Sequence, residues 1–212
     1  MQYKGAIFDM DGLLFDTERV FQETWHEIAG ENNVVLDKSF LKTVTGTSGE
    51  RLCRVIEEFY HISDGKPLVD DCTERVRKKL SVNVPIKEGT FEILEYFKRN
   101  NIKMAVASSS RIEQIESNLK ISGIKDYFDA VVSGTEVSHG KPAPDIFLYA
   151  AERIGCKPEE CFVFEDSENG IKAGHAAGCM TVMVPDLMEA SPEIRPYCYK
   201  VCSSLLEFVQ NL

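Results

Sequence analysis

Two carboxylates stand two residues apart, at Asp9 and Asp11, directly after an apolar run near the start of the chain. Burial opposes their charge and mutual repulsion raises the pKa of one of them, so the pair is costly unless a divalent cation offsets it. A carboxylate in such a site can attack phosphorus and form an aspartyl-phosphate, which divides one difficult step into two easier ones. We therefore predict that Asp9 is a nucleophile and that Asp11 transfers the proton of the ester oxygen. Taken alone, the Asp11-Gly12 pair is equally typical of a polar turn after a strand.

A cation site is the second prediction, because further carboxylates follow another apolar run at Glu165 and Asp166. Magnesium prefers oxygen ligands in near-octahedral geometry, with one or two carboxylates, phosphate oxygens and water. Asp9, the carbonyl of Asp11 and Asp166 meet this requirement, and Glu165 is either a further ligand or a partner outside the coordination sphere. The same acidic pair could instead cap a helix that starts at residue 168.

Two more polar clusters could bind the phosphoryl group. Ser108, Ser109 and Ser110 precede an expected helix at residues 112–122. One serine is enough to cap that helix, but hydroxyls and backbone N–H groups at a helix N-terminus also bind phosphate. Lys141 begins a Lys-Pro-Ala-Pro segment whose prolines fix the backbone. Its compact charge suits a phosphoryl group and an attacking carboxylate, although an isolated lysine of this kind is typically exposed to solvent.

These clusters follow segments that are short, apolar and rich in β-formers, as buried strands are. The predicted strands span residues 4–9, 102–107, 129–133, 161–165 and 180–184. Helical patterns lie between most of them, at residues 89–100, 112–122, 145–154 and 168–177. Strands that alternate with helices predict an α/β fold with a doubly wound, Rossmann-like parallel sheet. In such sheets ligands bind beyond the carboxyl ends of the strands, where we expect all four clusters to meet.

A long helical stretch without strands interrupts this alternation between residues 17 and 84. Apolar residues recur in it at helical spacing, and Pro85 and Gly89 close it. We therefore predict a Rossmann-like catalytic core made of residues 1–16 and 85–212, and an inserted helical cap made of residues 17–84.

The ordered motifs resemble the haloacid dehalogenase-like superfamily, and more closely its β-phosphoglucomutase-like branch, in which a helical cap follows the first strand. The resemblance covers nearly the whole chain, and it rests on the segments at residues 9–17, 108, 141–145 and 165–167. It implies the same core-and-cap fold, a magnesium cofactor and an aspartyl-phosphate mechanism. The dehalogenases of the superfamily lack the second aspartate and need no metal, so the resemblance argues against dehalogenation.

Carried over by position, the resemblance implies a role for each motif residue. Asp9 is the expected nucleophile and Asp11 the expected general acid and base. The transferring phosphoryl group would be held by Ser108, by the backbone near Ser109 and by Lys141. The cation would be bound by Asp166, with Glu165 as a helper.

Three functions remain open on the sequence. A phosphatase lets water attack the aspartyl-phosphate, a β-phosphoglucomutase-type mutase passes the phosphoryl group to another hydroxyl of a sugar phosphate, and a receiver domain stores it as a signal. The mutases carry a cap histidine where this chain has Phe21, and a cap arginine in a Gly-x-Ser-Arg stretch where it reads Gly46-Thr47-Ser48-Gly49. Both departures favour a magnesium-dependent phosphatase acting on a small phosphate ester such as a sugar phosphate.

Other cations of the predicted cap could replace that arginine. Arg51, Arg54 and the basic run at residues 75–79 are available, although such a run is typically a solvated helix face. A receiver domain, by contrast, needs neither a helical insertion of this size nor Asp11 as a proton donor, so it is the weakest of the three.

The composition excludes several other classes. The 212 residues carry a net charge of -10, which repels nucleic acid and anionic lipid but allows a small phosphorylated substrate at a locally positive site. No apolar run approaches the roughly 18 residues of a membrane span. The seven cysteines form no Cys-x-x-Cys pair, which is typical of reduced thiols. We therefore expect a cytoplasmic enzyme with no nucleic-acid or membrane partner.

Overall fold

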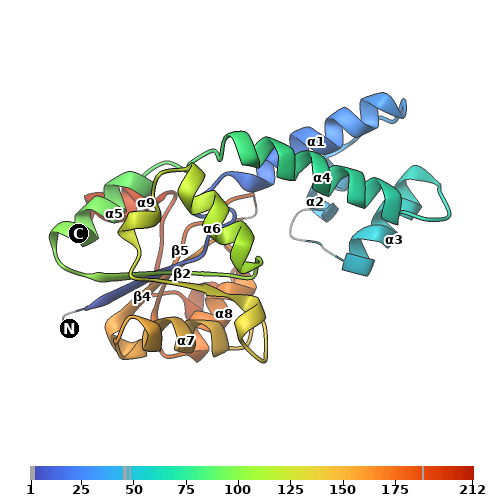
Figure 1. The fold of residues 1–212 in the computed structure, drawn as a ribbon. Coiled ribbons are helices and arrows are strands. Elements are labelled where there is room, and N and C mark those ends of the chain that lie inside the picture. The colour runs from blue at the N-terminus through green and yellow to red at the C-terminus, as the bar shows by residue number, and fades with distance from the viewer. Residues whose placement is uncertain (1–2, 45–46, 48, 188) are drawn as a thin grey trace. The chain divides into compact units, whose positions relative to one another are not determined.

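The computed structural model describes residues 3–44, 47, 49–187 and 189–212. The chain separates into two compact units, one formed by Met1–Asp16 with Pro85–Leu212 and the other by Thr17–Val84. The first unit contains the sheet and the second consists of helices (Figure 1).

A parallel sheet forms the centre of the first unit, in the strand order β3-β2-β1-β4-β5-β6. The strands are β1 (Gly5–Phe8), β2 (Lys103–Ser108), β3 (Ala130–Ser133), β4 (Cys161–Glu165), β5 (Met180–Met183) and β6 (Lys200–Val201). Ile7 of β1 pairs with Ala105 on one side and with Val163 on the other, and every residue of β1 is buried. The predicted doubly wound α/β fold is confirmed. The sequence does not predict β6, because a strand of two residues has no periodicity to detect.

Helices cover both faces of this sheet (Figure 1). One face carries α7 (Asp145–Arg153) and α8 (Glu168–Ala176), and the other carries α5 (Thr90–Arg99), α6 (Ile112–Ile121) and α9 (Leu205–Gln210). This is the arrangement that right-handed crossovers produce on either side of a central first strand. Short 3₁₀ turns complete the unit at Lys125–Tyr127, Gly134–Glu136, Pro158–Glu160 and Arg195–Tyr197.

Aromatic packing fixes β1 and β4 beside each other. The rings of Phe8 and Phe164 are stacked with centroids 4.9 Å apart, and Phe208 of α9 meets Phe164 edge-on, also at 4.9 Å. All three side chains are almost fully buried. Such pairs stabilise the core beyond the area that they bury. They hold the carboxyl ends of β1 and β4, where Asp9 and Asp166 follow, in a fixed relation.

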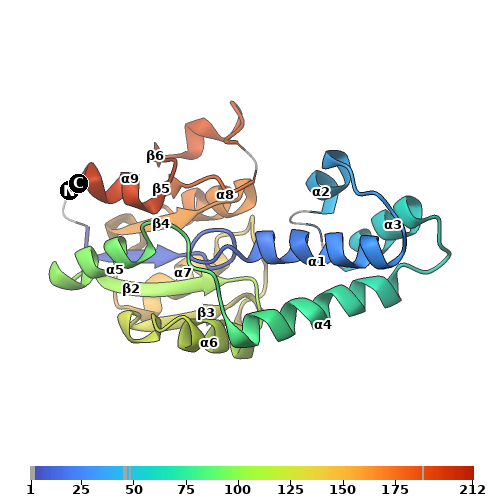
Figure 2. The same cartoon turned by 90° about the horizontal axis from the view of Figure 1, so that it is seen from above.

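The second unit contains α1 (Thr17–Glu31), α2 (Lys38–Val44), α3 (Gly49–Tyr60) and α4 (Lys66–Val82). Helices α1 and α4 lie side by side (Figure 2). Trp25 of α1 is buried and meets Phe40 edge-on at 5.9 Å. Polar pairs tie the two helices together: Arg75 donates to both carboxylate oxygens of Glu31 at 2.6 and 2.7 Å, and Lys79 lies 2.9 Å from Glu27.

Candidate active site

Asp9 follows β1 and begins a tight turn that carries the chain out of the sheet. Its backbone N–H donates to the carbonyl of Phe164 at 3.0 Å, which continues the pairing of β1 with β4. The carbonyl of Met10 then accepts from the N–H groups of Leu14 and Phe15 at 3.0 and 3.1 Å. Gly12 has a left-handed φ of +83°, and a methyl group at this position would overlap Oδ2 of Asp166. The turn therefore requires glycine for two reasons: its backbone conformation and its close approach to the carboxylate.

Lys141 reaches into this edge of the sheet and lies between two carboxylates. Its Nζ donates to Oδ1 of Asp9 at 2.5 Å and to Oε1 of Glu165 at 2.6 Å. The ammonium also lies 3.3 Å from the carbonyl of Ala107 and 5.0 Å from the ring centroid of Phe147. The lysine side chain is 8% exposed, so the expectation for an isolated lysine, a solvated side chain, is wrong here.

Glu165 is the last residue of β4, and both of its carboxylate oxygens have partners. Oε1 accepts from Lys141, and Oε2 accepts from the N–H and the hydroxyl of Ser167, both at 2.8 Å. The hydroxyl of Ser167 in turn accepts from the N–H of Gly170 at 3.1 Å, which caps α8. A helix cap and a buried carboxylate contact therefore coexist in this segment, with Ser167 as the capping residue.

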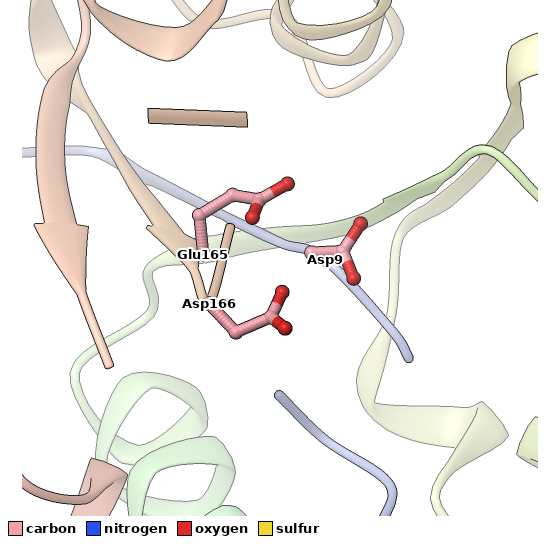
Figure 3. A group of neighbouring side chains, drawn as sticks. All are labelled: Asp9, Glu165 and Asp166. Atoms are coloured by element: carbon pink, nitrogen blue, oxygen red, sulfur yellow. The ribbon is translucent and has the colours of Figure 1, made fainter. Parts of the chain in front are cut away.

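Three carboxylates converge at this edge, from the ends of β1 and β4. Asp9, Glu165 and Asp166 each offer an oxygen within 4.8 Å of the others (Figure 3). Burial and the charges of Glu165 and Asp11 raise the pKa of Asp9 to about 7, against the opposing charge of Lys141. Burial and the charges of Glu165 and Asp9 raise the pKa of Asp166 well above its usual range. Hard oxygen donors that repel one another in a buried site suit a divalent cation, which would stabilise their charged forms.

The serine run contributes contacts that the sequence predicts only in part. The hydroxyl of Ser108 is buried and accepts from the N–H of Ser110 at 3.1 Å, whereas Ser109 is exposed. The hydroxyl of Ser110, which we expected to bind phosphate together with its neighbours, donates to Oδ2 of Asp11 at 2.9 Å, a contact that the sequence does not predict. The alternative that a serine caps the following helix is wrong, because Arg111 occupies the N-cap position of α6 without a side-chain bond.

A further polar pair beside the cluster is also absent from the prediction. Asp186 follows β5, the strand next to β4, and its side chain is 8% exposed and ion-paired with Lys87. The rule that marked the other clusters, a polar residue just past an apolar strand, would have identified Asp186 as well. Its charge adds to those that raise the pKa of Asp166.

The fold and this arrangement define a Rossmann-like protein with a buried carboxylate–lysine cluster at the carboxyl ends of its parallel strands. Residues 6–184 match the family model of the haloacid dehalogenase-like hydrolases. The chain therefore belongs to the haloacid dehalogenase-like hydrolase family, and it is an enzyme. Because the chain belongs to this family of hydrolases, the alternative that it is a receiver domain is wrong.

Several relatives are named as phosphatases. The chain is 36% identical to fructose-1-phosphate phosphatase YqaB of Escherichia coli, over 86% of this chain and 97% of that protein. It is 32% identical to the phosphorylated carbohydrates phosphatase of Thermotoga maritima, over 82% of each. Among solved structures, a β-phosphoglucomutase of Clostridium difficile superposes with a TM-score of 0.73 at 25% identity, covering 99% of this chain and 96% of that one. The resemblance to the β-phosphoglucomutase-like branch is confirmed.

Within the described part of the chain, no helix has both the length and the apolar character needed to cross a membrane.

Proposed function

We propose that this protein is a magnesium-dependent phosphatase that hydrolyses a small phosphate ester through an aspartyl-phosphate on Asp9. The observation that carries the proposal is the contact of Asp9 with Lys141 in a buried cluster with Glu165 and Asp166. A buried carboxylate that faces a lysine and two further acids is costly for stability alone. The same arrangement suits a site in which a nucleophile, a phosphoryl group and a metal cation are brought into contact.

Each predicted residue has a place in this reaction. Asp9 attacks phosphorus, and Asp11, held by the hydroxyl of Ser110, gives a proton to the leaving oxygen. Lys141, Ser108 and the backbone near Ser109 bind the phosphoryl oxygens.

The cation would be held by Asp9, the carbonyl of Asp11 and Asp166. When bound, magnesium offsets the negative charge of the substrate and orients its oxygens. Both oxygens of Glu165 already have protein partners, which favours Glu165 as a residue that positions Lys141 and Ser167 rather than a direct ligand. Asp166 lies against Gly12 and is the carboxylate best placed to serve the cation alone.

The substrate class follows from the relatives, which act on fructose 1-phosphate and on phosphorylated carbohydrates. We propose a sugar phosphate or a similar small ester. The competing function is mutase activity, which the structural likeness to a β-phosphoglucomutase supports. A mutase must hold a doubly phosphorylated intermediate, so it needs a second cationic site.

The second unit offers little for that purpose. Phe21 of α1 stands where the mutases have histidine, and Gly49 at the start of α3 has no side chain. Residues 46 and 48 of the same stretch lie outside the described residues. Of the proposed substitutes for the arginine, Arg75 and Lys79 are paired with acids of α1 and Arg54 with Glu50 of its own helix, whereas Arg51 is exposed. These contacts favour hydrolysis over transfer.

A phosphate-release screen over phosphorylated metabolites tests the proposal. The screen is run with magnesium, with excess chelator, and with the Asp9→Asn variant as the matched control. Release that requires both magnesium and Asp9 is the expected result. Release that continues unchanged in chelator, or no release from any phosphate ester in the screen, would contradict it.

A further inference from the structure

A lysine–carboxylate pair beside the cluster takes no part in the function proposed above. Nζ of Lys87 donates to Oδ1 of Asp186. The two side chains are 24% and 8% exposed. The backbone N–H of Lys87 donates to the carbonyl of Leu14 at 2.9 Å, so the lysine is anchored to the turn that follows Asp9. The pair therefore connects the end of β5 with that turn.

The second carboxylate oxygen of Asp186 makes no hydrogen bond within the described part of the chain. Oδ2 is buried and has no hydrogen-bond donor among the residues that the structure describes. A methyl group placed on Gly12 would overlap Oδ2 of Asp166 and would lie 3.4 Å from Oδ2 of Asp186. The two oxygens therefore border the same small space beside Gly12. A buried carboxylate oxygen without a donor is costly, and such an atom in a native protein indicates a water molecule or an ion.

The charges at this edge point to a cation. Within the described part of the chain, five acidic side chains lie at this edge, those of Asp9, Asp11, Glu165, Asp166 and Asp186, and Lys87 and Lys141 form ion pairs with three of them. Acids outnumber bases, so a divalent cation would stabilise the whole group. Asp186 does not belong to the compact ligand group of Asp9, Glu165 and Asp166, which places it one layer further out. Magnesium usually keeps several of its water molecules, and these are strong hydrogen-bond donors.

We propose that Asp186 is a positioning residue of the cation site: Oδ2 accepts a hydrogen bond from the hydration shell of the cation, while Lys87 fixes the carboxylate through Oδ1. This inference rests on the proposed function, since it requires the cation that Asp9 and Asp166 would hold. It adds a strand, β5, to the structure that supports the site. Partners outside the coordination sphere typically change metal affinity by about 10- to 100-fold.

The test is the affinity for magnesium, measured by calorimetry without substrate in the Asp186→Asn variant. Lys87 would bond to the amide oxygen, so the amide N–H₂ group would face the hydrated cation with donors instead of an acceptor. The magnesium dissociation constant should rise by about tenfold or more. Circular dichroism and thermal melting check that the variant is folded.

Two further variants separate this role from a structural one. Asp129→Asn removes a charge from another lysine–aspartate pair, Lys103–Asp129, beside the start of β2 and β3, and should leave magnesium affinity unchanged. Lys87→Met breaks the ion pair but keeps the carboxylate, so it should weaken binding less than Asp186→Asn. If Asp186→Asn fails to fold, the double variant Lys87→Met/Asp186→Leu avoids the unpaired charge and carries the same expectation.

The outcomes are distinct for the two proposals. If the parent protein binds magnesium and Asp186→Asn binds it equally tightly, the role of Asp186 is overturned and the proposed function stands. Equal weakening by Lys87→Met and Asp186→Asn would show that Asp186 acts only through the ion pair, which also overturns the inference. If the parent binds no magnesium and releases phosphate in chelator, both proposals fail.

Discussion

Lys141 donates to Asp9 at 2.5 Å, and the two side chains are 8% and 10% exposed. The same ammonium lies 2.6 Å from Glu165, whose side chain is 1% exposed. The ammonium group of Lys141 is thus shared by two buried carboxylates, and one of them, Asp9, is the proposed nucleophile. The lysine therefore stabilises the folded protein and, in the proposed reaction, binds the phosphoryl group.

Replacement of Lys141 by methionine should reduce both stability and activity. Removal of one partner from a buried ion pair leaves uncompensated charge and typically costs about 3 kcal/mol or more. The pKa of Asp9 is already raised to about 7, and without the lysine it rises further. A carboxyl group with a raised pKa in the folded state loses stability as pH increases, because the folded protein must then give up a proton. Urea unfolding should therefore show a larger loss at pH 8 than at pH 6.

Lys103→Met is the matched control for that experiment. Lys103 pairs with Asp129 at 2.7 Å, but its side chain is 58% exposed. Exposed pairs contribute little to stability, so this variant should change the unfolding free energy little at either pH. A loss in Lys141→Met that does not depend on pH would contradict the account of Asp9.

Magnesium affinity should fall as the solution becomes more acidic. Asp9, with a pKa raised to about 7, is largely protonated at pH 6 and ionised at pH 8. A proton competes with the cation for this carboxylate, so the apparent dissociation constant should be about tenfold higher at pH 6 than at pH 8. Calorimetry at the two pH values measures the constants, and buffers of different ionisation enthalpy report the proton released. Equal affinity at both pH values with no proton release would contradict the prediction.

Asp11→Asn should damage the turnover of sugar phosphates more than that of an activated aryl phosphate. A sugar alcohol is a poor leaving group that needs a proton, whereas an aryl oxide leaves without one. General acid catalysis is typically worth about 10²–10⁴-fold. Ser110→Ala, which removes the donor to Asp11, should cause a smaller loss with the same substrate dependence. Equal losses on both substrates would indicate that Asp11 acts only through structure or through the cation.

Hydrolysis should exceed transfer when a mutase substrate is offered. With β-glucose 1-phosphate and a trace of the 1,6-bisphosphate as primer, we expect inorganic phosphate or no product. The physical reason is the absence of a side chain at Gly49 and the pairing of Arg75 and Lys79 with acids of α1. Glucose 6-phosphate and phosphate are followed in one reaction. Catalytic accumulation of glucose 6-phosphate at constant phosphate would favour the mutase.

The sequence predicts those parts of the site that local patterns define. Asp9 and Asp166 could be predicted because each follows an apolar strand, and a parallel sheet brings the carboxyl ends of its strands together. Gly12 and Ser167 have local roles, in a turn and in a helix cap, that their residue types favour. The positions of these residues can be predicted from the residues next to them in the sequence.

Other residues of the site depend on contacts that no local pattern contains. Ser110 meets Asp11, and Lys87 meets Asp186, each across 99 residues of sequence. Lys141 is typical of a solvated lysine when taken alone, and its place was indicated only by the position of its loop among the other clusters and by the family resemblance. In the basic run predicted to be a solvated helix face, Arg77 and Lys78 are exposed, whereas Arg75 pairs with Glu31 of α1.

The central claim is that the phosphoryl group passes through Asp9, and trapping of the aspartyl-phosphate tests it most directly. The enzyme is mixed with its best substrate and magnesium, quenched in acid during turnover and reduced with borohydride, which converts an aspartyl-phosphate into homoserine. Mass spectrometry of the peptide that contains residue 9 should find homoserine at that position, and only when substrate and magnesium are both present. The account is contradicted if phosphate is released while residue 9 stays aspartate, or if Asp9→Asn releases phosphate at a rate close to that of the parent.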